Sequence, residues 1–153
     1  MQLRTSGDTP AEEHPPDSGG CRPIEQATWH LPAVDTSVGR LRHAVRAALK
    51  KWGLGEIGDI TELCVSELVT NSVIHSKEPA GCLTLNVTVD RERGRLRVSV
   101  ADTNPSAPQV REPMSDDEHG RGLLLVRALS AGWGVDHAPA RSGKVVWCEI
   151  ASR

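Results

Sequence analysis

Residues 61–76, TELCVSELVTNSVIHS, contain three polar side chains spaced four residues apart: Glu67, Asn71 and His75. On an α-helix this spacing places a carboxylate, an amide and an imidazole on one face. The residues around this ladder are apolar: Ile60, Leu63, Cys64, Leu68 and Ile74. We therefore expect this part of the helix to be at least half buried, where an acid and an amide need a polar partner. A magnesium ion with a nucleotide phosphate chain would provide one.

A second candidate is Asp102, in the segment VADTNPSAP at residues 100–108. It follows a predicted strand, where a carboxylate can accept a hydrogen bond from an exocyclic amine such as that of adenine. An Asp that begins a turn before Thr103-Asn104-Pro105 is an equally good interpretation. The residue alone does not decide between the two.

The third candidate is the segment HGRGLLLV at residues 119–126, where Gly120 and Gly122 flank Arg121 directly before a predicted helix. Glycines let a ligand approach the backbone closely, and the first N–H groups of a helix can bind phosphate. An ordinary helix entry would use the same residues, so a single G-x-G is weak evidence.

The helical candidates also have structural explanations when each is taken alone. Glu67 could pair with a lysine or arginine, Asn71 could bond to the helix backbone, and His75 could stabilise the helix end. The order of the three segments favours a common site. An acid–amide helix, a strand-end Asp and a glycine-flanked helix start can together surround one MgATP, because phosphoryl transfer needs mainly positioning and charge neutralisation.

The composition excludes several classes of protein. The chain has 153 residues, no Phe, no Tyr and a formal charge of −2. Binders of nucleic acid usually need stacking aromatic residues or a basic excess, so we expect no direct nucleic-acid binding. No apolar signal segment and no run of membrane-spanning length occurs, so we expect a cytoplasmic protein without membrane association.

The cysteines do not predict a metal site. None of Cys21, Cys64, Cys82 and Cys148 forms a C-x-x-C pair, which the common zinc sites would require. The last three lie in apolar segments and are expected to be small buried hydrophobic residues.

Residues 1–22 are rich in proline, glycine and acids, and we expect a disordered tail followed by one folded domain over 23–153. The periodicity predicts these elements: a strand from about residue 26; a helix capped by Asp35, Thr36 or Ser37 and ended by Gly53; a helix over 59–76; a hairpin over 82–90 and 95–101; a helix over 121–131; a short strand after 132–134; and a strand over 144–150. This order predicts an α+β two-layer sandwich, in which about three helices cover one face of a mixed or antiparallel sheet.

With these segments in place, the chain resembles the GHKL superfamily, whose ATP site is known as the Bergerat fold. ELVTNSVIH (67–75) resembles the N box of that superfamily, ADTNPSAP (101–108) occupies the place of its G1 box, and HGRGLLLV resembles its G2 box. The resemblance covers about residues 26–150 and implies a histidine-kinase-like ATP-binding domain. Within the superfamily the chain resembles the short, single-domain anti-sigma-factor serine kinases.

The resemblance assigns roles to the candidates. It implies that Glu67 is the general base, that Asn71 holds magnesium and that Asp102 binds the adenine amine, with residues 106–119 as the ATP lid. The candidate nucleotide-binding residues are Asn71, His75, Asp102, Asn104, Gly120, Arg121, Gly122 and Leu123. It also implies a homodimer that binds a sigma factor and phosphorylates a serine on an anti-anti-sigma partner of the STAS type.

One departure from the family pattern supports an alternative. The G1 box usually has glycines after the Asp, as D-x-G-x-G, whereas this chain has Asp102-Thr103-Asn104-Pro105-Ser106. Pro105 removes a donor and stiffens the turn. The alternative is a catalytically weak or inactive module that binds ATP or sequesters a partner. The catalytic half of a two-component histidine kinase is a third hypothesis, disfavoured because His43 lacks the acid and proline that usually follow a phosphoacceptor.

Overall fold

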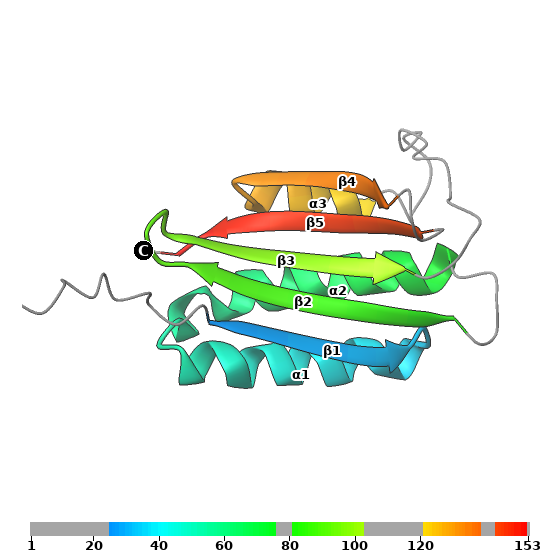
Figure 1. Ribbon diagram of the computed structural model, residues 1–153, viewed down its shortest axis with the longest axis horizontal. Helices are drawn as coiled ribbons and strands as arrows, with labels where there is room; N and C mark the ends of the chain where they lie inside the picture. The colour runs from blue at the N-terminus through cyan, green and yellow to red at the C-terminus, as the bar shows by residue number, and fades with distance from the viewer. Residues whose placement is uncertain (1–24, 76–80, 103–120, 139–142, 153) are drawn as a thin grey trace, which may run out of the picture.

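The computed structural model describes residues 25–75, 81–102, 121–138 and 143–152 (Figure 1). The strands are β1 (Gln26–Pro32), β2 (Cys82–Asp90), β3 (Arg95–Asp102), β4 (Gly132–Ala138) and β5 (Gly143–Ala151). The helices are α1 (Asp35–Lys51), the short 3-10 helix η1 (Gly55–Ile57), α2 (Gly58–His75) and α3 (Arg121–Leu129). Each predicted strand and helix is therefore present, with ends shifted by a few residues. None of the helices within these ranges has both the length and the apolar content needed to cross a bilayer.

The described strands form one antiparallel sheet in the order β1-β2-β3-β5-β4. Alternate residues of the three central strands are buried, as period-2 patterning predicts. The buried sets are Leu83, Leu85, Val87 and Val89 in β2, Leu96, Val98, Val100 and Asp102 in β3, and Lys144, Val146, Cys148 and Ile150 in β5. All but two of these residues are apolar, and the exceptions are the charged pair at one end of β3 and β5.

The three α-helices cover that buried face of the sheet, and the other face carries no helix among the described elements (Figure 1). From α1, the residues Leu41, Val45 and Leu49 enter the core, and from α2 the residues Cys64, Val65, Leu68 and Val69 do so. The Cys64 thiol hydrogen-bonds with Cys148, and this bond together with burial raises the pKa of the Cys148 thiol. The α+β two-layer sandwich predicted from the sequence is thus confirmed.

Two local predictions were wrong. Helix α1 is capped by Val34, whose backbone is extended, and no side chain bonds to the helix start. Ser37 lies in the first turn instead, where its hydroxyl donates to the Pro32 carbonyl at 2.6 Å. The second error is Cys82, which is exposed, whereas Cys64 and Cys148 are buried as expected. Cys82 shares its strand face with Thr84 and Asn86, on the side of the sheet that the helices do not cover.

The apolar residues around the polar ladder are all at least half buried, as expected, although to different degrees. Cys64 and Leu68 are fully buried, but Ile60, Leu63 and Ile74 are 39%, 38% and 47% exposed. The stripe of α2 that faces the sheet runs instead through Thr61, Val65, Leu68, Val69 and Ser72.

The two ends of the sheet differ in the segments that meet there. At the Gly94 end, the β2–β3 turn lies beside the C-terminus of β5, since Ser152 N–H donates to the Gly94 carbonyl at 2.9 Å. At the Asp102 end, β3 finishes opposite the start of β2 and the start of β5. Helix α2 runs towards the Asp102 end (Figure 1). The predicted tail at 1–22, the loop at 77–80 and the segment 103–119 lie outside the described residues.

Candidate functional site

Asp102 lies on the face of the sheet that the helices cover. It continues the buried series Leu96, Val98 and Val100 along β3, and it is 5% exposed. Glu67 and Asn71 belong to α2, which packs on the same face. Asp102 and helix α2 therefore lie on the same side of the sheet, which a single pocket would require.

Glu67 and Gly122 bring the first and third segments together. Gly122 is the second residue of α3, and a methyl group in place of its hydrogen would overlap the Glu67 Oε2 atom and lie 3.1 Å from Cδ. The carboxylate of α2 therefore occupies the space that a glycine leaves open at the start of α3. Both residues were predicted for the site from the sequence, and in the structure they lie in contact.

The ladder itself is present on α2. Glu67 and Asn71 are each partly buried and lie one helical turn apart. Among the described residues, neither side chain takes part in a hydrogen bond or ion pair. The structural alternatives, an ion pair for Glu67 and a backbone bond for Asn71, therefore find no support there. A carboxylate and an amide are the hard oxygen donors that magnesium accepts beside phosphate oxygens.

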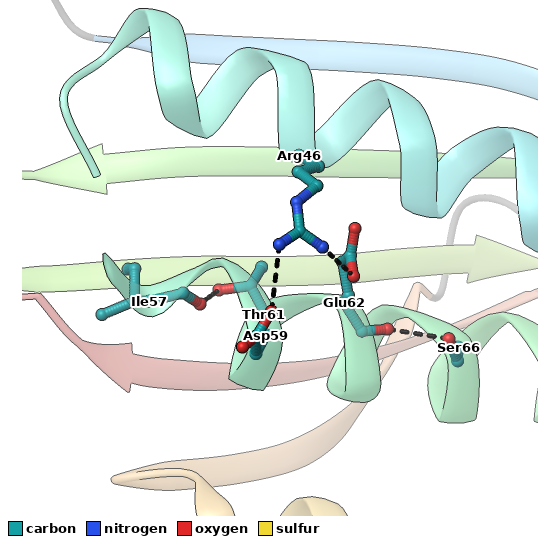
Figure 2. A network of polar contacts seen from close by, with 6 residues as sticks. All are labelled: Arg46, Ile57, Asp59, Thr61, Glu62 and Ser66. Carbon is teal, nitrogen blue, oxygen red and sulfur yellow. Dashed lines mark hydrogen bonds and ion pairs between the residues drawn. The ribbon is translucent and has the colours of Figure 1, made fainter. Parts of the chain in front are cut away.

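Glu62, which precedes Glu67 by five residues on α2, has a different environment. Glu62 accepts a hydrogen bond from Arg46 of α1 at 2.9 Å, and Arg46 also bonds Asp59 at 3.1 Å (Figure 2). The pKa of Arg46 is raised above its ordinary value, chiefly by this hydrogen bond to the Glu62 carboxylate. Glu62 and Asp59 thus connect α1 to α2, whereas Glu67 makes no such ion pair with the described residues.

The same part of α2 borders a hollow of about 400 Å³ that lies over α1 and α2. Its lining residues are Arg42, Asp59, Glu62, Leu63, Ser66 and Glu67. The Ser66 hydroxyl donates to the Glu62 carbonyl at 2.8 Å and so faces its own helix (Figure 2). Glu67 therefore lies between this hollow and the start of α3.

Several predicted residues cannot be placed. Asn104, Gly120 and the lid at 106–119 lie outside the described residues, as do the side chains of His75 and Arg121. The backbone of His75 forms the last residue of α2, and Arg121 begins α3. Leu123 is partly buried and packs against the hydrophobic core. Its described contacts are those of a core residue.

Lys144 was not among the site residues predicted from the sequence. This residue is the cross-strand partner of Asp102, and it is 6% exposed. Burial lowers the pKa of its ammonium group, and the negative charge of Asp102 opposes that shift. A signal was present in the sequence, because Lys144 alternates with Val146 and Cys148 and so falls on the buried face of the last strand.

Comparison with known proteins identifies the family of the chain. The sequence matches the histidine kinase-like ATPase domain family over residues 31–149, and the chain therefore belongs to that family. It is an ATP-binding domain of the GHKL type, with the kinase-like or ATPase-like fold that the superfamily shares.

Eleven chains of known structure match this fold. One is the histidine kinase domain from the blue-light activated histidine kinase of Erythrobacter litoralis EL346, with 24% sequence identity and a TM-score of 0.51. The match covers 79% of this chain and 61% of that chain, so this chain spans less than two thirds of that structure. At this identity the likeness concerns the fold alone. No curated protein sequence matches the chain.

Proposed function

We propose that the protein binds ATP with magnesium at the Asp102 end of the sheet and transfers the γ-phosphoryl group to a serine of a protein partner. The observation that carries the proposal is the contact between Glu67 and Gly122, with Asp102 on the same covered face of the sheet. Residues from three segments that are far apart in the sequence therefore lie on the helix-covered side of the sheet.

Each residue has a role in this proposal. Glu67 takes the proton from the serine hydroxyl, since a partly buried carboxylate can act as general base. Asn71 supplies an oxygen ligand one turn further along α2, and Asp102 accepts a hydrogen bond from the adenine amine. Gly122 leaves room for the Glu67 carboxylate at the start of α3, and the first backbone N–H groups of that helix favour phosphate. Bound magnesium would neutralise the charge of the phosphate oxygens.

The partner is proposed from the resemblance to anti-sigma-factor serine kinases. In this proposal a homodimer binds a sigma factor in the cytoplasm and phosphorylates an anti-anti-sigma protein of the STAS type. The surface hollow beside Glu67 supports access by a protein substrate, because it borders the proposed base from outside the sheet layer.

The test is transfer from labelled ATP to a candidate STAS-type protein from the same genome. We expect Glu67→Gln to lower the transfer rate by about 10²- to 10⁴-fold, the usual contribution of a general base, while ATP affinity changes little. The matched control is Glu56→Gln, an exposed acid in η1. Transfer at the native rate by the Glu67 variant would exclude the base assignment.

The alternative, a module that binds ATP or a partner without chemistry, is favoured by the sequence Asp102-Thr103-Asn104-Pro105-Ser106. Titration calorimetry with ATP and magnesium separates the two. Binding that depends on Asp102, together with no transfer to any candidate partner, would favour the module. No heat at all, with partner binding retained, would favour pure sequestration.

A further inference from the structure

Lys144 is a buried cation directly opposite the residue proposed to bind adenine. Asp102 and Lys144 are register partners across β3 and β5, with exposed fractions of 5% and 6%. Both lie on the face of the sheet that the helices cover. The neighbouring residues on that face are Val100 in β3 and Val146 in β5. Lysine is rarely buried to this degree unless it has a specific electrostatic partner.

Asp102 and Lys144 interact electrostatically within the buried layer, not at the surface. Burial disfavours the Lys144 ammonium, and the Asp102 carboxylate favours it. An apolar residue at position 144 would continue the series of Val146, Cys148 and Ile150 without that cost. The charge of Asp102 explains why the buried Lys144 ammonium is tolerated, but it does not explain why two charged residues occupy this place in the core.

The chemistry of the pair matches the edge of a base. A carboxylate only accepts hydrogen bonds, and an ammonium group only donates them. The adenine edge presents the same two functions in reverse, with the N6 amine as donor and the adjacent N1 as acceptor. A neighbouring carboxylate and ammonium are therefore complementary to both positions at once.

We propose that Lys144 is a specificity-determining residue that donates a hydrogen bond to N1 of adenine while Asp102 accepts one from the N6 amine. The inference rests on the proposed function, because it requires ATP to bind at Asp102. It adds a residue and a base position to that site. A site with a buried donor rejects an analogue that lacks the matching acceptor, because the donor is then left unsatisfied.

The test compares ATP with 1-deaza-ATP, in which N1 is replaced by C–H, by titration calorimetry with magnesium on the full chain. We expect the wild type to bind ATP at least 10-fold more tightly than the analogue. In Lys144→Met this ratio should fall to about twofold or less, whereas Lys144→Gln, which keeps a donor, should retain part of it. The control Lys51→Met, an exposed residue in the last turn of α1, should leave the ratio unchanged.

The outcomes separate the two levels of the proposal. Equal affinity of the wild type for ATP and 1-deaza-ATP would overturn the role of Lys144 while leaving ATP binding intact, and this result needs no variant to fold. A ratio that stays the same in Lys144→Met would also overturn it. Tighter binding of GTP than of ATP would overturn the adenine assignment. If the wild type bound no nucleotide, the proposed function itself would fail.

Discussion

Charged residues lie at the surface at one end of the sheet and are buried at the other end. At the Gly94 end, Arg91 lies at the surface and bonds Glu25 at 2.7 Å through Nε and the Trp52 carbonyl at 2.5 Å through Nη2. At the Asp102 end, Asp102 and Lys144 are buried, and Glu67 fills the space beside Gly122.

The difference indicates which end of the sheet contributes mainly to stability and which end contributes mainly to function. Surface charges with partners cost little to keep in place, because water still solvates them. Buried charges are costly and are retained where a ligand or partner needs them. We therefore expect substitutions at the Gly94 end to alter the free energy of unfolding, and substitutions at the Asp102 end to alter nucleotide chemistry.

The largest effect on stability is expected for Gly94→Ala. Gly94 has φ of 59°, and a methyl group there would lie 2.8 Å from the Ser152 carbonyl oxygen. The left-handed backbone costs an L-residue about 1 kcal/mol or more, and the contact with fixed backbone adds to it. We expect urea denaturation to show a loss of about 2 kcal/mol in unfolding free energy, with ATP affinity unchanged.

Gly53→Ala is the matched control for this substitution. Gly53 has a similar φ of 71°, but nothing lies within 4 Å of the added methyl group. Gly53→Ala should therefore lose only the unfolding free energy that the left-handed backbone costs, about 1 kcal/mol. Equal losses at the two positions would show that the contact with Ser152 contributes nothing.

At the other end, Gly122→Ala should affect catalysis more than stability. The added methyl group meets the mobile tip of Glu67 rather than backbone, so the carboxylate can rotate away at little energetic cost. Alanine also favours a helix over glycine by about 1 kcal/mol. We expect unfolding free energy to stay level or rise, and phosphoryl transfer to fall about 10-fold, equivalent to about 1.4 kcal/mol in the barrier.

Gly39→Ala in α1 provides the comparison for Gly122. Its added methyl group meets nothing within 4 Å, so it should gain helix stability without loss of transfer. A normal transfer rate in Gly122→Ala would mean that the position of the Glu67 carboxylate is not important for the reaction, and the distinction between the two ends would weaken.

The fold was predictable because its signals are local. Alternation located β1, β2 and β3, and the helical stripe of α1 was visible in Leu41, Val45 and Leu49. Cys82 was expected to be buried because its neighbours in the sequence are apolar. Its position in the alternation of the strand instead places it with Thr84 on the uncovered face. The cap of α1 was missed because the extended Val34 precedes the helix without any side-chain bond.

The site was predictable only in part. Spacing along α2 placed Glu67 and Asn71 on one helix face, but no local pattern could show that Gly122 contacts Glu67 across two helices. Lys144 required the register of β3 against β5, which pairs residues 42 positions apart in the sequence. Such contacts depend on tertiary packing, and only the folded chain displays them.

The smallest effect concerns the titration of Glu25 at the Gly94 end. The hydrogen bond from Arg91, assisted by its charge, holds the pKa of the Glu25 carboxyl below its ordinary value of 4.5. A native pKa below the unfolded one means that the native state binds fewer protons between the two values. The contribution to stability is therefore complete above pH 4.5, and it is lost as the pH falls through the lowered pKa.

Arg91→Met should move this titration back towards 4.5, as followed by the carboxyl carbon resonance of Glu25 in NMR spectra. Both groups lie at the surface, so raising the salt concentration should shift the wild-type pKa in the same direction. Neither the substitution nor the protonation of Glu25 should change the nucleotide affinity. A change in ATP affinity in Arg91→Met would show that the Gly94 end is coupled to the site, contrary to the division drawn between the two ends.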